Sequence, residues 1–153
     1  MTFYLIIIVS IVLDLVTKIA IRTNLEPGEK TELWGGVIKL THLANHGTSG
    51  YLFVGYGRWL AVLVLILVAV ALYLRSKGWF RSPLMQCGVA LVIGGAVGNA
   101  IDRIVYNQVT DFLYFSDQAT MNFADIWVYC GIVIIVADQI FRGFRPSSKK
   151  EGA

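Results

Sequence analysis

Four long apolar stretches dominate the pattern of hydrophobic and polar positions along the chain. They cover about residues 3–21, 58–75, 82–102 and 125–142, and few charged residues interrupt them. A helix needs roughly 20 mostly apolar residues to cross the hydrocarbon core of a bilayer. The pattern therefore predicts an all-α integral membrane protein with four transmembrane helices, which form a single domain over residues 1–142.

The connection between the first and second stretches follows a different pattern. The segment GGVIKLTHL, residues 35–43, is rich in β-branched and apolar residues in rough alternation, and turn-forming residues flank it at 35–36 and 45–50. These features are typical of a strand between turns. We therefore expect a small β element outside the membrane, beside the four helices.

Composition and charge add the class and the orientation of the protein. The chain is 56% hydrophobic, against about 45–50% in an ordinary soluble domain. Residues 75–81, RSKGWFR, hold three bases and no acid, and bases also dominate residues 142–153, whereas residues 22–58 balance four bases with three acids. Because cytoplasmic connections carry the excess of Lys and Arg, both termini and the polar tail at 143–153 are predicted in the cytoplasm, and the β element and residues 102–125 outside it. The net charge of +3 reflects this topology, so no nucleic-acid partner is expected.

Polar residues inside the predicted helices are candidates for structure or for function. A charge at the bilayer centre costs from about 2.5 to more than 10 kcal/mol, so such residues usually face the interior of a bundle. Asp14 and Lys18 are four residues apart and can form an ion pair on one helix face. Asn99, Asp102 and Arg103 share a face through their three- and four-residue spacing, and they too can serve either role.

Two further patterns concern the packing of the helices. Gly94, Gly95 and Gly98 form a small-xxx-small pattern in the third stretch, which allows the fourth helix to approach it closely. Asp138 lies four residues before Arg142 and can pair with it along one face of the fourth helix.

Asp111 and Asp125 differ from the other acids, because neither has a base three or four residues away. Asp125 has a structural explanation, since Asn122-Phe-Ala-Asp125 places an N-cap residue and a carboxylate at the start of the fourth helix. Asp111 lies in V-T-D-F-L, which predicts an extended segment. If the two carboxylates lie close together in a poorly hydrated setting, they share a proton. One can then activate a water while the other protonates a carbonyl oxygen.

Other residues suggest other kinds of chemistry. Gly47-Thr-Ser49-Gly50 resembles the G-x-S-G motif of intramembrane serine proteases, but it lies outside the predicted helices. His42 and His46 could bind a metal, yet HLANH lacks the Glu of H-E-x-x-H and no third ligand is evident. A small proton-coupled carrier would place its carboxylates at mid-bilayer, whereas the acids here gather near one face. No metal and no cofactor is therefore expected.

The blocks GGAVGNAIDRIVYNQVTDF and MNFADI resemble the G-N-x-x-D-R…V-x-D-F and F-N-x-A-D blocks of signal peptidase II, and Asp14-x-x-Thr17-Lys18 resembles a third motif of that family. The resemblance extends over essentially the whole chain. It implies four transmembrane helices with a small extracytoplasmic β element in the bacterial cytoplasmic membrane. It also implies an aspartyl endopeptidase that cleaves the signal peptides of lipid-modified prolipoproteins just before the diacylglyceryl-cysteine.

By this resemblance, the catalytic pair falls on Asp111 and Asp125. The positions that support the site or bind substrate are Asp14, Lys18, Asn45, Gly47, Asn99, Asp102, Arg103 and Asn122. We expect Asp102 to orient Arg103 and Asn99. Asp14 and Lys18 are expected either to form an ion pair with each other or to make separate hydrogen bonds to Asn99 and Arg103. The implied partners are lipidated prolipoprotein substrates and membrane lipid, with the enzyme a monomer. A divergent inactive paralogue and a proton-coupled carrier are the alternatives.

The predicted orientation can be tested by labelling single cysteines in intact cells. With Cys87 and Cys130 replaced, a Gly78→Cys variant should resist a membrane-impermeant thiol reagent, because residue 78 lies in the basic, cytoplasmic connection. A Glu29→Cys variant, in the opposite connection, is the control that should react. Labelling of position 78 from outside would reverse the orientation of the whole chain.

Overall fold

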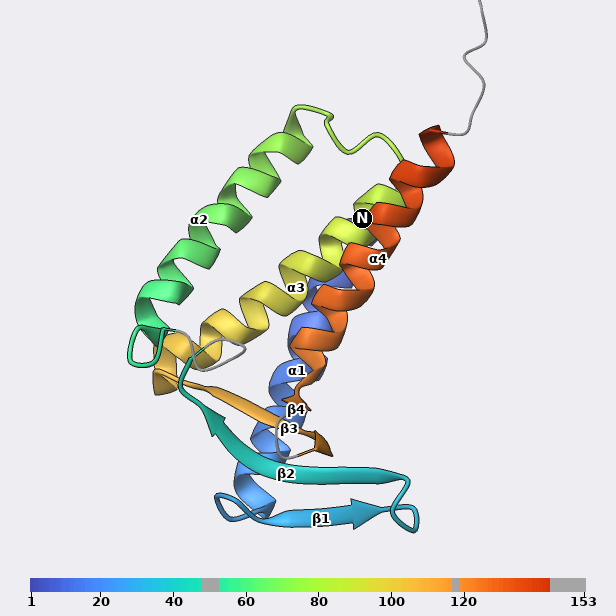
Figure 1. Ribbon diagram of the computed structural model, residues 1–153. Helices are drawn as coiled ribbons and strands as arrows, with labels where there is room; N and C mark the ends of the chain where they lie inside the picture. The colour runs from blue at the N-terminus through green and yellow to red at the C-terminus, as the bar shows by residue number, and fades with distance from the viewer. Residues whose placement is uncertain (48–52, 117–118, 144–153) are drawn as a thin grey trace, which may run out of the picture.

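The protein consists of four helices with a sheet across one end of them (Figure 1). The computed structural model describes residues 1–47, 53–116 and 119–143. The helices are α1 (Thr2–Asn24), α2 (Gly57–Ser76), α3 (Pro83–Tyr106) and α4 (Phe123–Gly143). The strands are β1 (Lys30–Leu33), β2 (Ile38–Asn45), β3 (Val109–Ser116) and β4 (Ala119–Met121). All four helices are long and apolar enough to cross a membrane.

The helices agree with the four predicted stretches, whereas the all-α description is incomplete. The strands form one antiparallel sheet in the order β1-β2-β3-β4. Strand β2 is the one expected from GGVIKLTHL, but β3 and β4 come from the segment between α3 and α4. Each helix also extends one or more residues past its apolar stretch, and α3 continues beyond Asp102 to Tyr106. A helix can include charged residues beyond its apolar stretch when other parts of the protein provide their hydrogen-bond and ion-pair partners.

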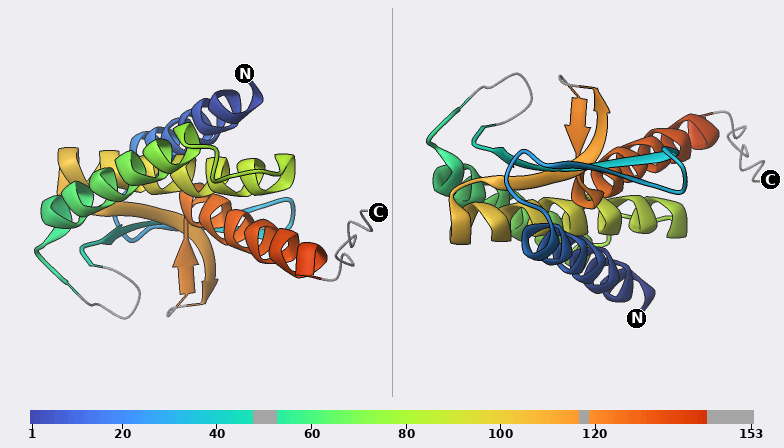
Figure 2. Two further views of the ribbon diagram at one scale, coloured as in Figure 1. Left: turned by 90° about the horizontal axis from the view of Figure 1, so that it is seen from above. Right: turned by 90° about the horizontal axis from the view of Figure 1, so that it is seen from below.

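Helix α3 is the centre of the bundle and packs against each of the other three helices. Viewed along the bundle, α1 and α4 flank α3 (Figure 2). Half of the apolar window of α3 is buried inside the protein, against 11% of the window of α2. The other three helices therefore direct most of their surface outward, as helices surrounded by lipid do.

Glycines in α3 allow this close packing on two sides. A Cβ atom at Gly95 would collide with the carbonyl oxygen of Ala124 in α4, which confirms the predicted approach of the fourth helix. On the other side, a Cβ at Gly94 would lie 2.6 Å from the Cβ of Ser10 in α1. A Cβ at Gly98 would lie 2.6 Å from the carboxylate of Asp14, so the absent side chain leaves room for a charged group.

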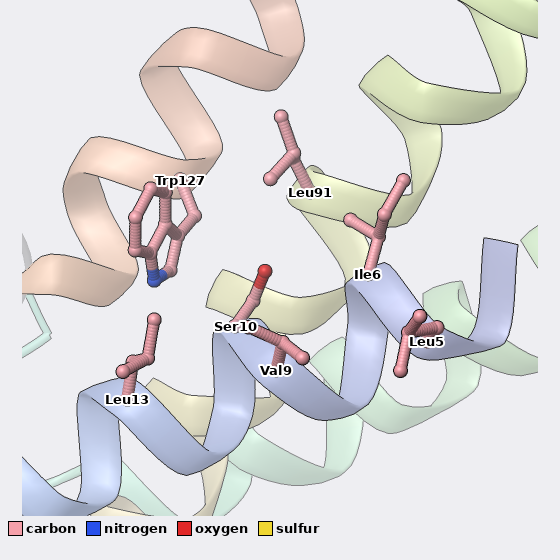
Figure 3. A pocket seen from close by; sticks show the side chains of 7 residues that line it. All are labelled: Leu5, Ile6, Val9, Ser10, Leu13, Leu91 and Trp127. Carbon is pink, nitrogen blue, oxygen red and sulfur yellow. The ribbon is translucent and has the colours of Figure 1, made fainter. Parts of the chain in front are cut away.

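An open apolar pocket of about 340 Å³ lies between α1, α3 and α4. Figure 3 shows that Trp127 of α4 lies opposite Leu13 of α1 in this pocket. The other lining residues are Leu5, Ile6, Val9, Ser10 and Leu91. No charged residue lines it, so the pocket does not mark the site that the charges predict.

The sheet holds β3 against the bundle at the point where Asp111 lies. The register between β2 and β3 shifts at one position, since Leu40 pairs with Leu113 but Leu43 pairs with Asp111. An extra residue on one strand redirects neighbouring side chains, and such bulges are common beside functional sites. Phe112 is buried and meets Phe123 of α4 edge to face, with ring centroids 5.5 Å apart.

Polar contacts hold α1 against its neighbours inside the bundle. Asp14 and Lys18 form the expected ion pair, 2.7 Å from Oδ2 to Nζ, and both side chains are fully buried. The other oxygen of Asp14 accepts a hydrogen bond of 2.8 Å from the backbone N–H of Ala124 in α4. Lys18 Nζ also donates to Asn99 Oδ1 of α3, at 2.8 Å. Of the two expected arrangements, the ion pair is therefore present, and the bond to the α4 backbone adds a contact that was not expected.

A second polar contact joins α3 and α4 at the opposite end of the bundle. Asp138 pairs with Arg142 at 3.0 Å, as the four-residue spacing predicted. It also accepts a hydrogen bond of 2.7 Å from Ser82, the N-cap residue of α3. This contact lies away from the sheet, so its residues can serve as controls for those near it.

Asp14→Ala should strongly destabilise the fold. The substitution leaves the Lys18 ammonium buried without its closest partner and frees the Ala124 N–H, and breaking a buried pair in this way costs about 3–5 kcal/mol. Unfolding in detergent micelles, followed by circular dichroism, measures the loss. Thr17→Ala is the matched control, because its hydroxyl bonds only to carbonyls of its own helix. An Asp14 variant that unfolds like the parent would show that this contact does not hold the helices together.

Candidate active site

Asp111 lies near the start of β3, where the strand enters the protein interior. Its side chain is 3% exposed. One carboxylate oxygen accepts a hydrogen bond of 2.9 Å from the Asn45 amide on β2, and the other accepts one of 2.7 Å from the Asn122 amide. Asn45 is paired with Val109, so its side chain reaches Asp111 diagonally on the same face of the sheet. Strand β2 and the N-cap residue of α4 thus hold the two oxygens of Asp111.

Asp125 lies in the first turn of α4, within the capping box that the sequence predicted. The N–H of Asp125 donates to Asn122 Oδ1 at 3.0 Å, and the N–H of Asn122 donates to Asp125 Oδ2 at 3.2 Å. The remaining oxygen of Asp125 accepts a hydrogen bond of 2.9 Å from the Asn99 amide of α3. Asn122 therefore caps the helix and contacts both Asp111 and Asp125.

The electrostatic setting of Asp111 favours its neutral form. The pKa of this carboxyl is raised from 3.8 to about 6. Burial is the largest cause, and the nearby charge of Asp125 is the next. The amides of Asn45 and Asn122 act in the opposite direction, because they donate to the ionised carboxylate. A carboxyl with a pKa of about 6 beside a second carboxylate can hold the proton that a pair of acids shares.

A chain of polar side chains connects Asp125 to α1. Asn99 donates to Asp125 through its nitrogen and accepts from Lys18 through its oxygen, so both ends of the amide are fixed. Lys18 bonds in turn to Asp14, and Asp14 accepts from the N–H of Ala124, the residue before Asp125. The contacts form a closed circuit through α1, α3 and α4, which fixes where Asp125 lies.

Asp102 has partners other than those expected. We expected it to orient Arg103 and Asn99, but its carboxylate binds Arg22 at 3.0 Å and accepts a hydrogen bond of 3.0 Å from the N–H of Thr110. It also lies 3.5 Å from Lys18. The expectation considered only neighbours on the same helix, whereas the hydrogen-bond partners of Asp102 come from α1 and β3.

Two residues of this cluster were missed by the sequence analysis. Arg22 donates to both Asp102 Oδ1 and Thr110 Oγ1 through Nη1, at 3.0 and 2.8 Å. A signal for Arg22 existed, because it follows Lys18 by four residues on the same helix face. Thr110 carried no such signal, since its role depends on how β3 docks against α1.

Arg103 and Gly47 also belong to the cluster around the two carboxylates. Arg103 donates a long hydrogen bond of 3.4 Å to the carbonyl oxygen of Gly47, and its guanidinium acts electrostatically on Asp125 and Asp111. The N–H of Gly47 donates to Asn45 Oδ1 at 3.1 Å, in a local turn. The structure thus brings together the ten residues expected at the site, from three helices, two strands and the connecting residues Gly47 and Asn122.

The alternative chemistries receive no support from the described residues. Ser49 and its neighbours Thr48 and Gly50 lie outside the described residues. The Nδ1 atom of His42 lies 2.8 Å from the carbonyl oxygen of Leu25, in the connection after α1. His42 lies in the middle of β2, and its ring contacts this connection.

Comparison with known proteins shows what the chain is similar to. A family model described as signal peptidase (SPase) II matches residues 6–141. A lipoprotein signal peptidase of Gloeobacter violaceus is 37% identical over 137 residues, which cover 88% of this chain and 79% of the relative. One of Symbiobacterium thermophilum is 38% identical over 133 residues, which cover 84% and 87%.

Two solved structures, each described as a bacterial membrane enzyme determined by the in meso method, share the fold at 26% identity. The first has a TM-score of 0.86 and covers 99% of this chain and 93% of its own. The second has a TM-score of 0.80 and covers 91% and 92%. Since the family model covers most of the sequence and relatives above 30% identity align along most of their length, the chain belongs to the signal peptidase II family.

Proposed function

We propose that the protein cleaves the signal peptides of lipid-modified prolipoproteins, with Asp111 and Asp125 as the two acids of an aspartic peptidase. Relatives named lipoprotein signal peptidase support the substrate class. The observation that carries the mechanism is the contact of Asn122 with both carboxylates, of which Asp111 has a pKa of about 6. Such a pair can share one proton at pH values below about 6.

The reaction follows from this difference in protonation. In the proposed mechanism Asp111 begins with the shared proton and Asp125 acts as the base. Asp125 accepts a proton from a water molecule that attacks the scissile carbonyl, while Asp111 protonates the carbonyl oxygen. The resulting tetrahedral diol collapses when a proton is transferred to the amide nitrogen, which leaves as an amine. Side-chain amides of Asn45, Asn99 and Asn122 donate to three of the four carboxylate oxygens, and the backbone N–H of Asn122 donates to the fourth. These bonds keep both groups oriented.

The position of the pair suits a substrate anchored in the bilayer. Asp125 lies in the first turn of α4, and Asp111 lies near the start of β3. Both residues are therefore located where the membrane helices meet the sheet (Figure 1). A signal peptide that crosses the bilayer as a helix would present its cleavage site at this level. With both termini in the cytoplasm, as the basic connections predict, the site faces the extracytoplasmic side. The cleaved bond would then precede the lipid-modified cysteine.

The carrier alternative is not favoured by the arrangement of charges. The buried charges of α1 bind one another and the backbone of α4. They lie beside the site at one end of the bundle and do not form a pathway across it. A proton pathway would need carboxylates near the middle of the membrane.

Asp111→Asn and Asp125→Asn should each abolish cleavage of a synthetic lipidated signal peptide by the purified enzyme. An amide can neither accept the proton of the water nor share one, so a loss of at least about 10³-fold in kcat is expected with little change in substrate binding. Asp138→Asn is the matched control, because Asp138 is also a buried, paired acid but lies at the opposite end of the bundle. Substantial turnover by either dyad variant would overturn the mechanism, as would full loss with Ser49→Ala while both dyad variants stay active.

The pH dependence of cleavage provides a separate check. Because the pKa of Asp111 is about 6, the singly protonated pair is lost as the pH rises through that value. The ratio kcat/KM should therefore fall about tenfold per pH unit above it. Asn45→Ala removes a donor that stabilises the ionised carboxylate, so the pKa of Asp111 should rise and the fall should begin at higher pH. If the fall in kcat/KM instead began at lower pH in Asn45→Ala, the fall would not reflect the ionisation of Asp111.

A further inference from the structure

Helix α1 carries a stripe of three charged residues toward the interior. Asp14, Lys18 and Arg22 follow one another at four-residue intervals, which places them on one helix face. Lys18 is fully buried, and the Arg22 side chain is 18% exposed. Asp14 and Lys18 reach α4 and α3, whereas Arg22 reaches the sheet. Arg22 is therefore the residue through which α1 can act on β3.

The contacts of Arg22 meet at the residue that precedes Asp111. Arg22 Nη1 donates to the hydroxyl of Thr110 at 2.8 Å and to Asp102 at 3.0 Å. The second oxygen of Asp102 accepts the N–H of Thr110. Thr110 is thus held through its side chain and its backbone by one ion pair. Since adjacent residues of a strand point to opposite faces, fixing Thr110 on one face fixes the direction of Asp111 on the other.

Arg22 also affects the partner of Asp125 through charge. In this cluster the acids Asp14 and Asp102 lie beside the bases Lys18 and Arg22. Arg22 lies 3.0 Å from Asp102, whereas Lys18 lies 3.5 Å from it and only 2.7 Å from Asp14. With Asp102 neutralised by Arg22, Lys18 remains at 2.8 Å from Asn99, the residue that donates to Asp125.

We propose that Arg22 is a positioning residue for peptide-bond cleavage, which holds Asp111 through Thr110 and Asp125 through Lys18 and Asn99. The proposal rests on the proposed function of Asp111 and Asp125. Arg22 contacts neither Asp111 nor Asp125. It acts on them through the residues that connect it to each. Its guanidinium is itself held in place, because the ring of Tyr106 lies 4.5 Å from its central carbon. A planar guanidinium can stack on a ring and donate two bonds at once, which a lysine does less well.

Four variants and one control test the proposal with a lipidated peptide substrate. Arg22→Met removes the donors but keeps an unbranched chain, and Thr110→Val removes the hydroxyl but keeps a β-branched residue in the strand. The double variant measures whether the two act together. Arg22→Lys keeps the charge beside Asp102. Arg142→Met is the control, because it removes another Arg–Asp contact of 3.0 Å at the far end of the bundle.

Arg22→Met should lower kcat by about 10- to 100-fold while KM changes by less than about threefold, since small displacements of reacting groups have effects of this size. Thr110→Val should lower kcat by about 3- to 10-fold. The double variant should be no worse than Arg22→Met alone, because both changes break one contact. Arg22→Lys should restore part of kcat, and Arg142→Met should stay within about twofold of the parent. Melting curves show that each assay uses folded protein.

Hydrogen exchange of residues 109–113 gives a readout that does not depend on turnover. The amide of Thr110 should exchange faster in Arg22→Met than in the parent and in Arg142→Met, because its acceptor Asp102 has lost its partner. Unchanged exchange, or parental kcat in either Arg22→Met or Thr110→Val, overturns the positioning role. If Arg22→Met does not fold, Thr110→Val decides alone. A parent enzyme that cleaves and is silenced by Asp111→Asn supports the proposed function whatever the result for Arg22.

Discussion

The buried ammonium group of Lys18 is the constraint on which the rest of the structure depends. A lysine in the interior of a membrane protein is tolerated only when neighbouring groups replace its water. Lys18 has three donors, and its neighbours are Asp14 at 2.7 Å, Asn99 at 2.8 Å and Asp102 at 3.5 Å. Each neighbour has a second contact. Asp14 binds the backbone of α4, Asn99 binds Asp125, and Asp102 binds the backbone of β3. Satisfying one charge therefore fixes two helices, one strand and one carboxylate of the proposed pair.

Small residues make this polar cluster possible in a lipid environment. Without water, helices associate through close packing and internal hydrogen bonds, and both require backbones that approach each other. Gly98 leaves the space that the Asp14 carboxylate fills, and Gly95 lets the backbone at Ala124 reach α3. The same approach brings the Ala124 N–H within 2.8 Å of Asp14. Helix packing and site geometry are thus determined by the same contacts.

Asn122 and Asn107 each combine a role in local backbone structure with a contact to another element. Asn122 caps α4, which confirms the predicted cap, and its side-chain amide also donates to Asp111, one of the two proposed catalytic acids. Asn107 ends α3 in the left-handed region at φ 58°. Asparagine tolerates that conformation, and its side chain accepts the N–H of Arg58 at the start of α2.

The sequence alone determined the features that depend on local pattern: four apolar helices, the strand in residues 35–43, the capping box of α4 and the Asp14–Lys18 pair. These follow from periodicity and four-residue spacing, which are properties of one element at a time. Only the tertiary structure decided which elements meet. It placed β3 and β4 in the sheet, gave Asp102 to Arg22 and Thr110, and joined Asp14 to the backbone of α4. The reason is physical: a buried charge binds whichever partner the packing brings near, and that partner can lie anywhere along the chain.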